Sequence, residues 1–120
     1  SLSVSVLCPS TAGEKASFSD ASYVDAGAKI LGQAEVLGDA DIVTRIHPPT
    51  AALVAKLAGK TLISMIQPAQ NGDLYQQLVA QGTNVLALDC VSRMLSRGQS
   101  FDILSSQANI AGYRAVVEAA

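Results

Sequence analysis

The chain has 120 residues, of which 49% are hydrophobic and 15% charged, and its net charge is −2. This length fits one domain or most of one, and the apolar content is ample for a core. The sequence has no basic stripe and only 4% aromatic residues, which disfavours nucleic-acid binding. No apolar run is long enough to span a membrane. The low charge indicates either surfaces covered by other protein or a compact, Ala- and Gly-rich domain.

Short strand and helix signals alternate in the first third of the chain. The valines at 4 and 6 predict a strand over residues 3–8, and a minimal strand is expected over 29–31. Between them, residues 19–28 have the pattern of a short helix that begins at a capping residue and ends at a glycine. Another turn of helix is expected over residues 35–40.

The remainder of the chain repeats the same alternation with longer signals. Nearly continuous apolar runs predict strands over residues 41–47, 61–66 and 83–89. Helix signals follow each of these strands, over residues 50–57, over residues 71–80 and from about residue 100 to the end.

This repeated β-α alternation with short loops predicts an α/β fold. We expect a three-layer, flavodoxin- or Rossmann-like domain, in which helices cover both faces of a parallel sheet. Ligand sites in such sheets lie beyond the C-terminal ends of the strands. Polar residues follow three consecutive predicted strands at these ends: Arg45 and His47, then Gln67 and Gln70, then the segment 89–102.

The loop after the last predicted strand is unusually rich in hydrogen-bonding side chains. Arg93, Arg97, Gln99 and Asp102 surround Gly98 within ten residues. A rigid guanidinium fork and the paired donor and acceptor of a carboxamide suit a flat, polar ligand such as a nicotinamide carboxamide. A helix signal follows directly, so backbone N–H groups at its N-terminus also point toward this loop.

Two common signatures of ligand binding are missing from the sequence. There is no GxGxxG and no GxxxxGK[ST], so the usual pyrophosphate cradle is absent, and a bound dinucleotide would have its phosphates held by another domain. The two cysteines, Cys8 and Cys90, lack CxxC partners and are expected to be reduced. Together with His47 they are too few for a metal site, so no metal is expected.

Four segments of the chain resemble a known family. They are KASFSDASYVDAGAKI at 15–30, ADIVTRIHPP at 40–49, TLISMIQPAQN at 61–71 and, most specific, NVLALDCVSRMLSRGQSFDILSSQANIAGYRAV at 84–116. The chain resembles the N-terminal, non-Rossmann half of the NAD(H)-binding component of proton-translocating nicotinamide nucleotide transhydrogenase. Alanine dehydrogenase shares this domain.

The resemblance implies a function, cofactors and partners. Family members pass a hydride from NADH to NADP⁺, with NAD(H) in the cleft between the two halves of the component. NADP(H) lies on a separate component, and a membrane component moves the proton. The implied partners are these two components, a Rossmann NAD-binding domain and a second copy in a homodimer. The implied location is the cytoplasmic face of a bacterial inner membrane or the mitochondrial matrix side.

The resemblance also implies site residues. In the family, a loop with an arginine, a glutamine and an aspartate covers the nicotinamide. Here the glutamine corresponds to Gln99 and the aspartate to Asp102, and Ser105 corresponds to a serine that braces the loop. The arginine corresponds to Arg93, but the spacing to Gln99 is one residue longer than usual, so Arg97 is an alternative.

The same resemblance can be used to examine alanine dehydrogenase chemistry. That enzyme holds and protonates pyruvate with a lysine and a histidine, whose positions here carry Arg45 and Gln67. Glutamine cannot act as a general acid, which disfavours this chemistry. Gln67 is instead expected to line the cofactor cleft, because hydride transfer between nicotinamides requires positioning and exclusion of water.

Three functional interpretations therefore stand. The first is the NAD(H)-side domain of a transhydrogenase, inactive by itself. The second is a non-catalytic α/β assembly module, and the third is half of an alanine dehydrogenase-like oxidoreductase. The family domain has a strand and helix before the segment matching Ser1 and a Rossmann half after the segment matching Ala120. Residues 1–120 are therefore expected to be one incomplete N-terminal half.

Overall fold

The computed structural model describes residues 4–120, which contain five short strands in two parallel sheets. The first sheet pairs β1 (Leu7–Pro9) with β2 (Lys29–Leu31). The second has the order β3 (Ile42–Thr44), β4 (Thr61–Ser64) and β5 (Asn84–Ala87). Each sheet belongs to its own structural unit, Ser1–Asp41 or Ile42–Ala120. The parallel α/β class expected from the sequence is confirmed.

The first unit is a small β-α-β-α arrangement around one pair of strands. A 3-10 turn, η1 (Glu14–Ala16), and α1 (Asp20–Asp25) connect β1 to β2, and α2 (Gln33–Asp39) follows. The Ser19 hydroxyl caps α1 by accepting the amide of Ser22 at 3.4 Å. Helix α1 packs against β2 and α2 against β1, and Cys8 and Leu37 are the buried apolar residues of this unit.

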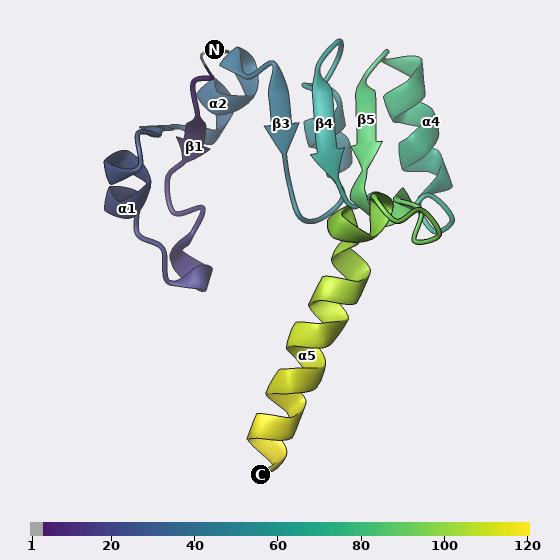
Figure 1. Cartoon of the computed structure of the whole chain (residues 1–120). Coiled ribbons are helices and arrows are strands. Elements are labelled where there is room, and N and C mark those ends of the chain that lie inside the picture. The colour runs from purple at the N-terminus through teal and green to yellow at the C-terminus, as the bar shows by residue number, and fades with distance from the viewer. Residues whose placement is uncertain (1–3) are drawn as a thin grey trace. The chain divides into compact units, whose positions relative to one another are not determined.

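The second unit has the larger set of buried apolar residues, and helices connect its strands (Figure 1). Helix α3 (Ala51–Val54) lies between β3 and β4, and α4 (Gly72–Ala80) lies between β4 and β5. Since α3 and α4 contact each other, they cover the same face of the sheet. The buried apolar residues of the unit are Val43, Leu53, Val54, Leu57, Leu62, Ile66 and Leu78.

Strand register decides which side chains join this core. Val43, Leu62 and Val85 are aligned across the three strands and share one face. Ile42 and Leu86 belong to the opposite face, and each is 58% exposed in the described chain. All three strands end at the same edge of the sheet because they are parallel, and the loops that leave this edge carry the polar residues singled out above.

A long helix follows the last strand. After β5 the chain forms two 3-10 turns, η2 (Leu88–Cys90) and η3 (Gly98–Phe101), and then α5 (Ile103–Ala119). Helix α5 leads away from the C-terminal edge of the β3-β4-β5 sheet (Figure 1). It buries none of its side chains in the described chain. It contacts η2, which anchors its first turns beside the strand ends.

The sequence located every strand and α-helix but overestimated several lengths. The strand expected over 29–31 is confirmed, whereas the strand expected over 3–8 is Leu7–Pro9, and Ser3 lies outside the described residues. The strand expected over 41–47 ends at Thr44, although the amide of Arg45 still donates to Ile63 O at 2.9 Å. The helix expected to begin near residue 100 begins at Ile103, because residues 98–101 form η3 first.

Candidate functional site

The loop between η2 and α5 brings together the three loop residues expected from the sequence. The Nε atom of Arg93 lies 3.2 Å from Oδ2 of Asp102. The side-chain Nε2 of Gln99 donates to the backbone carbonyl of Arg93, also at 3.2 Å. An ion pair thus joins Arg93, near the start of the loop, to Asp102 at its end, and Gln99 is hydrogen-bonded to the backbone of Arg93. The Arg93 side chain remains 55% exposed, so part of the guanidinium is accessible to a ligand.

Gly98 makes this tight loop possible. A Cβ atom built on Gly98 would overlap the backbone carbonyl oxygen of Ser92. Any other residue would therefore push the two backbone segments apart. Ser92 and Gly98 directly precede Arg93 and Gln99, so this close approach helps to set the positions of both residues.

Asp102 is the most heavily bonded side chain of the loop. It is the N-cap of α5, where its Oδ1 accepts the amides of Leu104 at 3.0 Å and Ser105 at 3.3 Å. Its Oδ2 accepts the hydroxyl of Ser105 at 2.5 Å, in addition to pairing with Arg93. Only 7% of the Asp102 side chain is exposed. The residue therefore caps the helix and also orients Arg93 and Ser105.

These contacts keep the carboxyl of Asp102 ionised. The Ser105 hydroxyl is the largest cause that lowers the pKa of Asp102. The amides of Ser105 and Leu104 and the charge of Arg93 act in the same direction and outweigh the opposing effect of desolvation. A carboxylate held in this way presents fixed negative charge next to Gln99 and Arg93.

The structure distinguishes the two loop arginines. Arg93 makes the ion pair with Asp102, whereas the backbone carbonyl of Arg97 accepts the hydroxyl of Ser100 at 2.8 Å. In the described chain, Arg97 forms no ion pair with an acidic residue. The longer spacing before Gln99 therefore leaves Arg93 at the junction with Asp102.

Gln67 lies at the neighbouring strand end in a left-handed backbone conformation. Its φ is +51°, which is uncommon for a residue other than glycine. Its side chain is exposed, and its carbonyl accepts the amides of Gln70 at 2.9 Å and Asn71 at 3.0 Å. Gln70 thus forms part of the turn that leads into α4.

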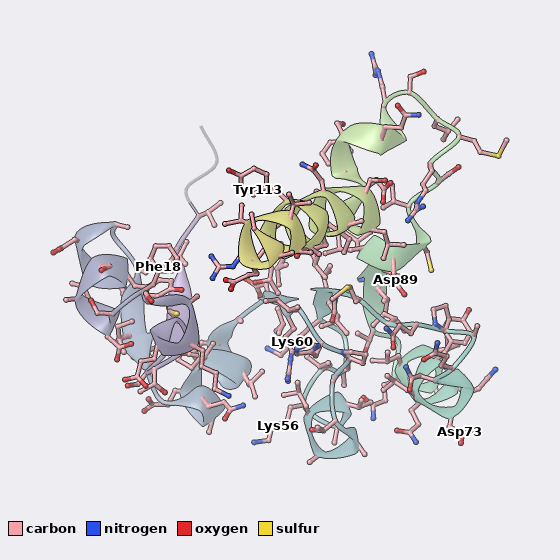
Figure 2. All side chains as sticks on the ribbon, turned by 90° about the horizontal axis from the view of Figure 1, so that it is seen from below. Phe18, Lys56, Lys60, Asp73, Asp89 and Tyr113 are labelled. Carbon is pink, nitrogen blue, oxygen red and sulfur yellow. The ribbon has the colours of Figure 1, made fainter. Side chains whose placement is uncertain are left out.

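Asp89 lies in η2, just before the loop that leads to α5 (Figure 2), and the sequence predicts it only as the first member of the polar segment 89–102. Its two carboxylate oxygens instead accept the consecutive amides of Ile66 at 3.0 Å and Gln67 at 2.6 Å. Burial alone would raise the pKa of Asp89, but hydrogen bonds from Ile66, Gln67 and its own amide lower it overall. The sequence signal for this role is an acidic residue at the end of the apolar run that predicts a strand over residues 83–89.

The polar residues that follow β3, Arg45 and His47, contribute less to the candidate site than those after β4 and β5. The carbonyl of His47 accepts the hydroxyl of the buried Ser64 at 3.0 Å, while the His47 side chain is exposed. Arg45 is half-buried. His47 therefore helps to satisfy a buried polar group through its backbone.

The described part of the chain offers no metal site. Residues 4–120 contain no group of three or more His, Cys, Asp or Glu that could hold an ion. Cys8 is buried and Cys90 exposed, and both are free thiols. Within the same residues, no helix combines the length and the apolar character needed to cross a membrane.

Comparison with known proteins matches this arrangement to a family. Residues 1–111 match the family described as "Alanine dehydrogenase/PNT, N-terminal domain". The chain is 46% identical over 120 residues to NAD(P) transhydrogenase subunit alpha from Haemophilus influenzae, covering 99% of this chain and 23% of that protein. It is 49% identical over 110 residues to NAD(P) transhydrogenase subunit alpha from Cereibacter sphaeroides, covering 90% and 21%. The chain thus spans about a quarter or less of these relatives.

Solved structures give the same result. A transhydrogenase from Sinorhizobium meliloti superimposes with a TM-score of 0.88 at 30% identity, covering 95% of this chain and 34% of that chain. An L-alanine dehydrogenase superimposes with a TM-score of 0.69 at 26% identity, covering 78% and 26%. The family resemblance expected from the sequence is confirmed: the chain belongs to the alanine dehydrogenase/transhydrogenase N-terminal domain family.

Proposed function

We propose that this chain is the nicotinamide-side part of the NAD(H)-binding component of a proton-translocating transhydrogenase. In this role it lines the cleft that holds NAD(H) and takes part in hydride transfer from NADH to NADP⁺ on a partner component. The observation that carries the proposal is the joined set of Arg93, Gln99 and Asp102 at the strand ends. The relatives named as transhydrogenase subunits support it.

The chemistry of the loop fits a nicotinamide. Its carboxamide is flat and carries one acceptor and one donor group, which match an exposed guanidinium and a glutamine amide. The nicotinamide supplies the hydride chemistry when bound, and the loop needs no acid or base of its own. The Asp102 carboxylate, with its lowered pKa, keeps Arg93 in place beside the ring. Gln99 is then free to exchange its contact with the Arg93 carbonyl for one with the ligand.

Several features of the proposed assembly lie outside the described residues. A Rossmann half would hold the dinucleotide phosphates, because the chain has no glycine-rich cradle. An NADP(H)-binding component, a membrane component and a second copy would complete the enzyme, at the cytoplasmic face of a bacterial inner membrane or on the matrix side in mitochondria. These partners follow from the family and are part of the proposal. The domain assignment of residues 1–120 as one incomplete N-terminal half also stays a prediction.

The alanine dehydrogenase alternative is less favoured by this chain. The family includes both activities, and the L-alanine dehydrogenase structure shares the fold. Gln67 stands where protonation of a substrate would require a histidine, and a carboxamide has no proton to give at neutral pH. Assays of alanine oxidation and of hydride transfer to NADP⁺ on one preparation separate the two functions.

The decisive test of the loop is Gln99→Asn in the complete enzyme. The shorter side chain withdraws the amide by one methylene, so hydride transfer in single turnovers should slow about tenfold or more, whereas the Kd for NADH should change little. The matched control is Gln76→Asn, because Gln76 is an exposed glutamine on α4. Unchanged turnover in Gln99→Asn would count against the loop assignment.

A further inference from the structure

Asp89 joins two strand ends that are far apart in the sequence. It follows β5 and lies within η2, and its carboxylate accepts the amides of Ile66 and Gln67, which follow β4. The side chain is half-buried, and η2 also packs against β4 and α5. One carboxylate thus spans 22 and 23 residues of chain to hold two consecutive N–H groups.

The backbone that Asp89 holds is in an unfavourable conformation. Gln67, at φ +51°, adopts the left-handed region without being glycine. Such a conformation persists only when the surrounding contacts enforce it. The Asp89 oxygen that bonds Gln67 lies 2.6 Å from its nitrogen, the shorter of the two Asp89 contacts.

The other side of the same turn is held by Asn71. Its side-chain Nδ2 donates to the carbonyl of Ile66 at 2.9 Å and to that of Gln67 at 3.4 Å. Asn71 therefore holds the carbonyl groups of the turn, and Asp89 holds its N–H groups. Asp89 is the only one of the two that also belongs to the segment carrying Arg93, four residues further on.

We propose that Asp89 is a positioning residue that fixes Gln67 at the rim of the cofactor cleft and keeps the β4 end in register with the Arg93 loop. This inference rests on the proposed function, because it assumes that Gln67 lines the NAD(H) cleft. Asp89 itself does not touch the cofactor. It acts through the backbone of Gln67, whose amide donates to the Asp89 carboxylate.

The ionisation of Asp89 is consistent with this role. Its pKa is lowered because the hydrogen bonds from Ile66, Gln67 and its own amide outweigh the effect of burial, so the group is a carboxylate at neutral pH. An ionised carboxylate accepts at both oxygens, whereas an asparagine side chain accepts at one and donates at the other. The Asp89→Asn variant therefore brings an amide NH₂ toward a backbone N–H.

The test is Asp89→Asn in the complete enzyme, with two readouts. Hydrogen exchange in the segment 66–71 should rise about tenfold, since a charge-assisted hydrogen bond is lost. The Kd for NADH should rise by the same factor as in Gln67→Ala, and the double variant should be no weaker than either single variant. The matched control is Asp73→Asn, an exposed carboxylate on α4, which should change neither value (Figure 2).

Each departure from this pattern overturns the inference. Unchanged exchange at 66–71 would show that Asp89 does not hold the turn. Raised exchange with an unchanged Kd, or with effects that add to those of Gln67→Ala, would show a purely structural role. Failure of the proposed function is separate, because it would appear as a wild-type enzyme that transfers no hydride between the two nucleotides.

A second variant keeps the test decisive if Asp89→Asn folds poorly. Glycine adopts the left-handed conformation without strain. In a Gln67→Gly background, the hydrogen bonds to Asp89 should therefore contribute less to holding this backbone conformation. The loss of melting temperature caused by Asp89→Asn should fall to about half or less in the Gln67→Gly background. An equal loss in both backgrounds would overturn the proposed hold on Gln67.

Discussion

Two aspartates organise the C-terminal edge of the larger sheet, and they differ in what they hold. Asp102 bonds locally, to residues two and three positions along the chain, and its remaining partner is an exposed arginine. Asp89 bonds the backbone at a distance of more than 20 residues, and it is itself half-buried. Asp102 therefore positions Arg93, a side chain that a ligand can reach. Asp89 holds the backbone at the ends of β4 and β5, which is the frame of the candidate site.

The loop around Asp102 and the backbone held by Asp89 have different tasks. Asp102 accepts hydrogen bonds from the first turn of α5 and pairs with Arg93, so its contacts act within the loop and the start of that helix. The hydrogen bonds that Asp89 accepts connect the ends of β4 and β5, so their loss should affect the turn at residues 66–71. Single substitutions can separate the two regions, and the largest effect is expected in the loop.

The strongest way to disturb the loop without touching its frame is Gly98→Ala. The added Cβ would overlap the Ser92 carbonyl oxygen, so the backbone must move and carry Arg93 and Gln99 with it. A displacement of about 1 Å can reduce a rate about 100-fold, and single-turnover hydride transfer should fall by this order.

The matched control for this variant is Gly112→Ala, within α5. A Cβ on Gly112 meets no atom within 4 Å, and alanine favours a helix over glycine by about 0.5–1 kcal/mol. Gly112→Ala should leave hydride transfer unchanged and raise the melting temperature slightly. An equal loss of rate in both variants would mean that the effect is not specific to the loop.

Replacing each loop arginine by lysine tests whether Arg93 or Arg97 contacts the ligand. In Arg93→Lys the planar fork is replaced by a single ammonium group, so the contact with Asp102 and with a flat ligand is weakened, and kcat/KM should fall about tenfold. Arg97→Lys should change it less than about twofold, because Arg97 forms no ion pair in the described chain. A larger effect for Arg97→Lys would reverse the assignment.

The smallest expected effect is on stability at acid pH. Asp89 and Asp102 both have a lowered pKa in the folded state, so each stabilises the fold above its ordinary pKa and loses this contribution as the pH falls through the folded value. Thermal melting of wild type and Asp89→Asn should therefore differ by a few degrees at pH 7 and converge below about pH 4.

Asp102→Asn provides the comparison for the pH measurement. At pH 7, Asp102→Asn should lower the melting temperature less than Asp89→Asn does. The hydrogen bonds of Asp102 are local, whereas those of Asp89 join two strand ends. A difference between wild type and Asp89→Asn that persists unchanged at low pH would show that the stabilisation does not come from the ionised carboxylate.

Much of the candidate site, as a set of neighbouring side chains, could be predicted from the sequence. The segment SRGQSFDILSS, within the family-like stretch 84–116, points to Gln99 and Asp102 as candidates, and the alternation of apolar runs puts them after a strand and before a helix, where the structure has them. Gln67 was placed correctly at the end of β4, but its left-handed backbone carries no signal in residue type. Asp89 was underestimated, because an acidic residue that bonds backbone amides looks like any solvated acidic residue in one dimension.

The amino-acid sequence by itself determined the local features of this protein: the order of strands and helices, the parallel α/β class and the polar loop before α5. These features depend on the spacing of apolar residues, on helix-capping residues and on glycines, all of which influence only the few residues around them. Only the tertiary structure decided that Arg93 rather than Arg97 pairs with Asp102, and that Asp89 holds Gln67. Such contacts depend on strand register and loop closure, which bring together groups that the sequence keeps far apart.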